Sequence, residues 1–217
     1  TVLNEQGEKM SKRNGAKPVT QYREEGYLPD AMVNYLARLG WSHGDDEIFS
    51  REQFLQWFNL DHLGKSAAQF DEAKLRWVNA QHIKLTPDEV LAPLVRAHLH
   101  KRGIEADEHL VGICALFKDR CDTTLVLADW AAVFYAEVQP PETELALHVT
   151  EAVKPAIRLL ADKLAHCVWD KPGIAAAIKE VLQAHRLKMP QLAMPVRVLV
   201  AGSAHTPSLD AMLTLFV

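Results

Sequence analysis

The sequence predicts an all-α fold. Apolar residues recur at three- and four-residue spacing along most of the chain, residues that start and stop helices repeat, and few runs alternate as strands do. The 217 residues are 48% hydrophobic and 24% charged, which is typical of a globular protein with a sizeable core. Because no apolar run approaches the roughly 20 residues that a membrane span needs, we expect a cytoplasmic protein with no membrane partner.

The first expected helices have clear start and stop signals. Pro29 at a first helical position and Gly40 after the last turn bracket one helix. Ser50 and Gln53 have the spacing of a capping box, in which each side chain bonds a backbone N–H of the other residue. Asp71 can cap the helix that follows, since its carboxylate can accept a free N–H of the first turn.

The second half of the chain continues the helical pattern. Thr86, followed by a proline and an acidic residue, is expected to cap a helix that Gly103 ends. Further helices are expected over His109 to Phe117, Thr124 to Glu137, Glu151 to His166, Gly173 to Arg186, Gln191 to Val200 and Pro207 to Phe216.

Two turn-rich segments, residues 82–87 and 139–141, are the best candidate boundaries. They divide the chain into residues 1–84, 85–140 and 141–217. We therefore expect three helical modules instead of a single bundle.

Charge and cysteine content narrow the possible functions. A formal net charge of −4 argues against unselective binding of polyanions, so any nucleic-acid site must be local. No acidic residue lies between Glu180 and Asp210. One basic cluster lies near the start of the chain and consists of Lys9, Lys12, Arg13 and Lys17. The three cysteines, Cys114, Cys121 and Cys167, lack the spacing of metal ligands, and we expect reduced, packed thiols and no metal site.

The segment GEKMSKRNGA carries the most chemical information. Lys9 and Lys12 flank Ser11 on a loop between Gly7 and Gly15. The two ammonium groups can bind phosphate oxygens, and the hydroxyl or the backbone can add a contact. By itself this short motif also fits an exposed basic turn, so its interpretation depends on the surrounding sequence.

The surrounding sequence resembles class I glutamyl-tRNA synthetases of the bacterial type. KMSKR, followed by NGAKPVTQYREEGYLPDAMVNYLARLGWSHGDDEIFS, is similar to their KMSKS-type loop and stem-contact region, and FDEAKLRWVNAQHI is similar to the segment that closes this region. LAMPVRVLVAGSAHTPSLDAMLTLF resembles the end of their anticodon-binding domain. The resemblance implies a stem-contact helical region followed by an α-helical anticodon-binding domain.

The same resemblance implies roles for the loop residues. Lys9, Ser11 and Lys12 are the expected catalytic residues, and Met10 and Arg13 are expected to contact ATP with them. Family members use ATP and Mg²⁺ to form glutamyl-adenylate and then transfer glutamate to tRNA. The lysine charges would stabilise the triphosphate in the transition state of the first step.

Five residues are expected to bind the anticodon. By resemblance, Arg197, Thr206, Pro207 and Leu209 match positions that line the anticodon pocket, with Thr206 and Pro207 starting the last helix. A simple capping role for Thr206 remains an alternative. Arg120 matches an arginine that faces the third anticodon base, although an ion pair with a neighbouring aspartate explains it equally well.

The expected partner is glutamate tRNA, bound through its acceptor-side stem and its anticodon loop by a monomer. The HIGH-like motif and the Rossmann domain of class I synthetases are missing from these 217 residues, so we expect the chain to be inactive alone, with no ATP or Mg²⁺ bound. A glutaminyl enzyme is disfavoured because that family ends in β-barrels. The alternative function is a stand-alone, non-catalytic tRNA-binding module.

Overall fold

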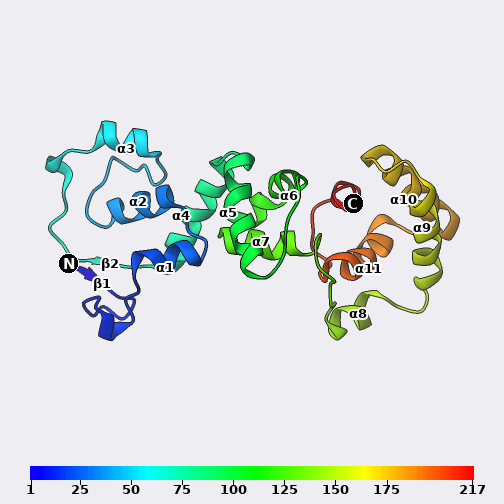
Figure 1. Cartoon of the computed structure of the whole chain (residues 1–217). Helices are drawn as coiled ribbons and strands as arrows, with labels where there is room; N and C mark the ends of the chain where they lie inside the picture. Colours follow the sequence, from blue (N-terminus) through cyan, green and yellow to red (C-terminus); the bar gives the residue numbers. More distant parts are fainter. The chain divides into compact units, whose positions relative to one another are not determined.

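The computed structural model describes all residues 1–217 and confirms the all-α prediction (Figure 1). It contains twelve α-helices and one small sheet, in which two short strands, β1 and β2, run parallel. The chain forms two compact units: unit 1 holds Thr1–His98 and Lys118–Ala128, and unit 2 holds Leu99–Phe117 and Asp129–Val217. The three-module division expected from the sequence remains a prediction.

The secondary-structure elements fall into two groups along the chain. The elements of the first part are β1 (Val2–Leu3), the 3-10 turn η1 (Lys12–Asn14), α1 (Val19–Glu24), α2 (Pro29–Arg38), α3 (Arg51–Trp57), η2 (Leu60–His62), β2 (Ala68–Gln69), α4 (Glu72–Leu85) and α5 (Asp88–Lys101). The later elements are α6 (Leu110–Phe117), η3 (Lys118–Arg120), α7 (Thr124–Ala132), α8 (Glu142–His148), α9 (Lys154–His166), α10 (Lys171–His185), α11 (Met189–Ala201) and α12 (Leu209–Leu213).

The expected helix starts are largely confirmed. Helix α2 begins at Pro29, and Ser50 and Gln53 form the complete capping box of α3. Asp71 caps α4 by accepting the N–H of Lys74 at 3.1 Å. These devices act within one turn of backbone, which explains why local sequence predicts them well.

Other local predictions were wrong. The Thr86 hydroxyl does not cap α5: it donates to the carbonyl of His82 at 2.6 Å and so closes the end of α4. The last helix starts at Leu209, after Thr206 and Pro207, and it is only five residues long. Helix α8 was not expected at all, because its seven residues follow a double proline and are mostly polar or exposed.

Each unit has its own apolar core. In unit 1, α2 packs on α4, and fully buried side chains come from α4, α5 and α7: Leu75, Ile83, Leu91 and Leu127. In unit 2, α9 packs on α10, and α10 also contacts α12. The fully buried side chains there include Leu110, Ile113, Phe117, Leu160, Ile174, Ile178 and Leu192. Burial of these side chains is the main source of stability for such short helices.

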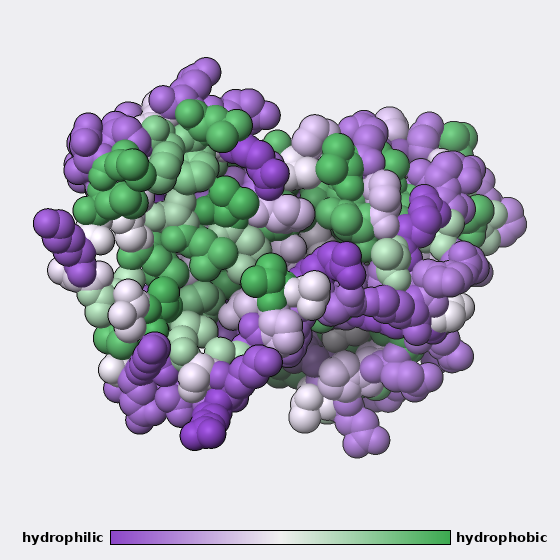
Figure 2. Space-filling model, turned by 60° about the vertical axis from the view of Figure 1, so that its left-hand side comes forward, coloured by the Kyte–Doolittle hydropathy of each residue, from purple (hydrophilic) through white to green (hydrophobic).

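The surface of unit 1 is uneven in hydropathy. Figure 2 shows apolar side chains gathered mainly on the left of the view. Exposed leucines in this unit include Leu55 of α3 and Leu60 of η2. No helix of the structure is long and apolar enough to span a bilayer.

Candidate functional site

The loop that carries Lys9 to Arg13 is fixed at its base by backbone pairing. Strand β1 pairs with β2, Leu3 also bridges Lys9 in antiparallel fashion, and the N–H of Met10 donates to the carbonyl of Val2 at 3.0 Å. Only residues 70–71 separate the end of strand β2 from the start of α4. The loop is therefore anchored to the segment that leads into a core helix.

The loop itself is closed by a short 3-10 turn. The carbonyl of Ser11 accepts the N–H groups of Asn14 and Ala16, each at 3.0 Å, and the Asn14 side chain donates to the carbonyl of Lys9 at 3.0 Å. Gly15 follows with a φ of +84°, a conformation that glycine adopts without a steric cost. These bonds use backbone acceptors and leave the cationic side chains unconstrained.

The charges of this loop face solvent. The side chains of Lys9, Lys12 and Arg13 are exposed, and none of them forms an ion pair. The side chains of Met10 and Ser11 are half-buried beside them, and the Ser11 hydroxyl makes no capping bond to η1. A short segment thus presents three exposed cations, and the binding of a polyphosphate by them stays a prediction.

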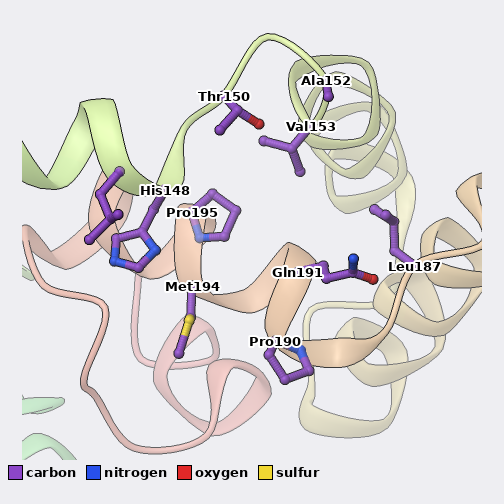
Figure 3. A pocket seen from close by; sticks show the side chains of 10 residues that line it. His148, Thr150, Ala152, Val153, Leu187, Pro190, Gln191, Met194 and Pro195 are labelled. Atoms are coloured by element: carbon purple, nitrogen blue, oxygen red, sulfur yellow. The ribbon is translucent and has the colours of Figure 1, made fainter.

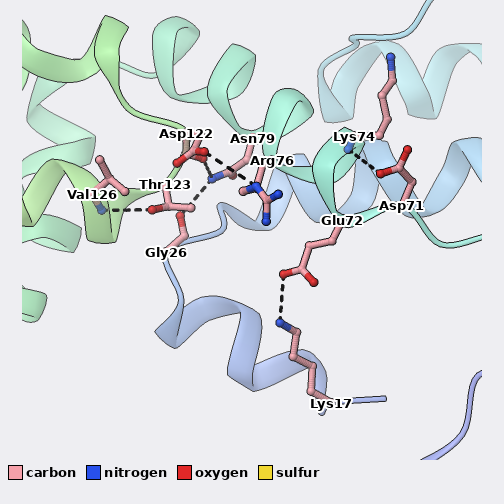
Figure 4. Close-up of polar contacts among 10 residues, drawn as sticks. All are labelled: Lys17, Gly26, Asp71, Glu72, Lys74, Arg76, Asn79, Asp122, Thr123 and Val126. Carbon is pink, nitrogen blue, oxygen red and sulfur yellow. Dashed lines mark hydrogen bonds and ion pairs between the residues drawn. The ribbon is translucent and has the colours of Figure 1, made fainter. Parts of the chain in front are cut away.

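Lys17, also in the basic cluster, has a different role. Its ammonium group bonds Glu25 of the segment after α1 at 2.6 Å. It also bonds Glu72 of α4 (Figure 4), at 3.3 Å. Burial alone would lower the pKa of Lys17, but the hydrogen bonds with the two carboxylates outweigh it and raise the pKa. Lys17 therefore holds α1 against α4, and its charge is already balanced.

The expected anticodon residues at the C-terminal end lie in unit 2, on α11, in the loop after it and at the start of α12. Arg197 is half-buried on α11, whereas the side chains of Thr206, Pro207 and Leu209 are buried. The Thr206 hydroxyl donates to the carbonyl of Pro207 at 2.8 Å, so it caps no helix. Because α12 is so short, its N-terminus does not provide the helix-start site that the sequence suggested.

The exposed side chains of this loop were not predicted. His205 and Ser208 are exposed on either side of the buried Thr206 and Pro207. No sequence pattern separates them from their neighbours, since all four residues are small or amphipathic and lie in an irregular segment. The buried residues set the shape of the loop, and His205 and Ser208 form its surface.

Arg120 belongs to unit 1, whereas the other four expected anticodon residues belong to unit 2. It ends the 3-10 turn η3 and is exposed. The structure shows no ion pair between Arg120 and either Asp119 or Asp122, and the nearest cation to Asp122 is Arg76, at 4.0 Å. The ion-pair explanation of Arg120 is therefore not supported.

Comparisons with known proteins find two family matches along the chain. The family described as an anticodon binding domain matches residues 90–216. The chain belongs to the anticodon-binding domain family. Residues 1–77, which include the KMSKR loop, match the catalytic domain of class I tRNA synthetases for glutamate and glutamine.

Individual relatives of this anticodon-binding family member are glutamate–tRNA ligases. The chain is 79% identical over 215 residues to the glutamate–tRNA ligase of Albidiferax ferrireducens, and the match covers 99% of this chain and 46% of that protein. It is 75% identical over 219 residues to that of Paracidovorax citrulli, with the same coverage. The chain corresponds to a C-terminal part of these ligases and spans about half the length of the curated relatives it matches.

A solved structure supports the same assignment. The crystal structure of a glutamate tRNA ligase from Elizabethkingia meningosepticum in complex with its amino acid superimposes with a TM-score of 0.84 at 26% identity. The match covers 99% of this chain and 47% of that protein. The helical fold of this anticodon-binding family member is therefore shared with part of that ligase structure.

Unit 2 of this anticodon-binding family member also contains a pocket of about 370 Å³ (Figure 3). Prolines and aliphatic side chains line most of it, and His148, Thr150 and Gln191 add polar atoms. The Gln191 side-chain oxygen accepts the N–H of Lys188 at 2.8 Å, so its amide nitrogen is left for other partners. The pocket lies between the end of α8 with the segment after it and the start of α11, and only the α11 side belongs to the acid-free stretch.

Neither the KMSKR loop nor the α11–α12 loop contains a group of side chains that could hold a divalent metal. The one group of metal-ligating side chains is Asp107, Glu108 and His109 in unit 2. The Asp107 carboxylate already accepts the Tyr135 hydroxyl at 2.8 Å and contacts the His109 ring at 3.1 Å. The cations of the KMSKR loop fit phosphate oxygens and not a metal ion.

Proposed function

We propose that this chain is the tRNA-binding part of a glutamate–tRNA ligase and also carries the KMSKR loop of its ATP site. The supporting observation is that one chain contains both a match to the class I catalytic domain, over residues 1–77, and a match to the anticodon-binding domain, over residues 90–216. An enzyme that joins an amino acid to tRNA needs both a phosphate-binding loop and a surface that selects the tRNA.

The proposed roles follow from the placement of the side chains. Lys9 and Lys12 bind the triphosphate of ATP while the glutamate carboxylate attacks the α-phosphorus, so that glutamyl-adenylate forms and pyrophosphate leaves. Met10, Ser11 and Arg13 complete the contacts with ATP. The lysines act most strongly in the transition state, because charge accumulates on the phosphate oxygens there. Mg²⁺, when bound with ATP, would neutralise part of the same charge.

The tRNA is proposed to bind along both units. The helices of unit 1 contact its acceptor-side stem, and the α11–α12 loop of unit 2 reads anticodon bases through Arg197 and the backbone around Thr206, Pro207 and Leu209. Arg120 reads the third anticodon base. Single-stranded bases are recognised by splaying them out and pairing their edges, which suits an arginine beside an irregular loop. We expect a monomer to suffice.

The test compares the isolated 217-residue chain with the full-length ligase. We expect the chain to bind glutamate tRNA but to show no glutamate-dependent exchange between ATP and pyrophosphate, because the groups that position adenine, ribose and glutamate are not in it. The full-length ligase is the positive control. Exchange by the pure isolated chain would refute this division of labour.

The second candidate, a stand-alone tRNA-binding module, differs in one measurable respect. In such a module the KMSKR loop has no ATP to bind, so its alanine variants would leave aminoacylation in a complemented cell extract unchanged. The exposed, unpaired lysines favour the ligase, because exposed cations on a fixed loop suit a phosphate ligand.

A further inference from the structure

The turn η3, which carries Arg120, is held within unit 1 from two sides. On one side, the Lys118 ammonium group contacts the Asp88 carboxylate at 2.9 Å and donates to the carbonyl of Thr86 at 2.9 Å. On the other side, the segment that follows Arg120 is bonded to helix α4 (Figure 4). The exposed arginine therefore projects from a backbone with fixed supports.

Asn79 of α4 is the centre of the second support. Its side chain is 0% exposed, and its amide makes three bonds to three backbone groups. Its oxygen accepts the N–H of Leu28 at 2.9 Å, and its nitrogen donates to the carbonyls of Gly26 at 3.1 Å and Asp122 at 2.7 Å. One side chain thus joins the α1–α2 connection, helix α4 and the segment after Arg120.

Gly26 brings the same two segments into direct backbone contact. Its carbonyl also accepts the N–H of Thr124 at 2.9 Å. A Cβ atom at this position would lie 2.5 Å from the backbone nitrogen of Leu125. Since backbone atoms cannot move aside as a side chain can, the approach is possible only for glycine.

We propose that Asn79 is a positioning residue for anticodon recognition: it fixes the Arg120 turn on the stem-contact helix α4. This proposal rests on the proposed role of Arg120 as a reader of the third anticodon base. A guanidinium group discriminates a base only when its N–H groups meet the acceptors of that base closely, and a loose turn spreads it over many orientations. The buried amide removes that freedom without touching tRNA.

The chain offers a matched control in Asn34 of α2. Its side chain is 1% exposed and also makes three bonds: it donates to the carbonyl of Glu47 at 2.9 Å, accepts the N–H of Phe49 at 3.1 Å and contacts the His82 ring at 2.8 Å. None of these partners belongs to the segment around Arg120. The Asn34→Ala variant therefore loses a comparable buried amide in the same unit while the support of η3 stays intact.

The experiment measures aminoacylation by the full-length ligase with glutamate tRNA and with tRNAs substituted at each anticodon base. We expect Asn79→Ala to lower the preference for the correct third base by about tenfold, which is within the range for loss of one well-placed arginine contact. The preference of the Asn79→Ala variant for the correct first and second anticodon bases should stay unchanged. We expect Asn34→Ala, although destabilised, to keep all three preferences.

Further variants keep the outcomes distinct. If Arg120→Ala leaves the third-base preference intact, the proposed role of Arg120 fails. If Arg120→Ala abolishes it but a folded Asn79→Ala retains it, the positioning proposal alone is overturned. If Asn79→Ala does not fold, Lys118→Met removes the opposite support at a part-buried site, and an unchanged third-base preference in that variant overturns the proposal. Equal losses in Asn34→Ala and Asn79→Ala would also overturn it.

Discussion

The close backbone contact at Gly26 makes a sharp prediction for stability. Gly26 has a φ of +95°, and the Cβ atom of an alanine would lie 2.5 Å from the Leu125 nitrogen and 2.9 Å from the Thr124 nitrogen. The left-handed backbone costs an L-residue roughly 1–2 kcal/mol. Overpacking against backbone adds about 1–3 kcal/mol, and the displaced Thr124 bond about 1 kcal/mol more. Together these contributions predict that Gly26→Ala destabilises unit 1 by roughly 3–6 kcal/mol.

Gly44 provides the control for this prediction. It also has a positive φ, +54°, in unit 1, but nothing lies within 4 Å of the position its Cβ would take. Gly44→Ala should therefore cost only the roughly 1–2 kcal/mol of backbone strain. Urea denaturation gives the free energy of unfolding of both variants, and amide exchange of the Thr124 N–H reports the contact itself. Equal stability of the two variants would show that the close contact does not exist in solution.

Three further predictions concern the proposed sites and the core. In the full-length ligase, Lys12→Ala should lower the rate of adenylate formation about 100-fold, because the lysine charge acts on the transferring phosphates. The affinity for tRNA should stay almost unchanged. Loss of tRNA affinity with normal adenylate formation would make the loop a tRNA contact instead. Arg197→Ala should weaken the binding of cognate tRNA and reduce the preference for it over anticodon variants. Lys188→Ala should weaken the binding of all tRNAs alike and reduce the salt dependence of binding. Unchanged discrimination in a folded Arg197→Ala protein would remove Arg197 from the site. Burial lowers the pKa of His82 below its ordinary value of 6.5. As pH falls, the unfolded chain therefore binds a proton at His82 before the folded chain does. The stability of unit 1 should fall as pH drops below about 6.5. Urea denaturation at several pH values should show that fall in the wild type and less of it in His82→Gln.

The sequence alone determined the features that depend on neighbouring residues. The capping box of Ser50 and Gln53, the cap of Asp71 and the start of α2 at Pro29 each act within one helical turn, so they could be predicted from spacing. The family could be recognised for the same reason, since the KMSKR loop and the C-terminal segment are contiguous motifs. The prediction failed where the chain is short or irregular, as at α8 and at the start of α12.

Only the tertiary structure decided which residues of a given type hold the fold and which stay exposed. Lys12 and Lys17 belong to one basic cluster in the sequence, but Glu25 and Glu72 neutralise Lys17, whereas Lys12 stays exposed. Asn79 looks like any polar residue of an exposed helix until Gly26 and the segment after Arg120 are placed against it. A side chain's partners come from distant parts of the chain, and no pattern of spacing within one helix contains them.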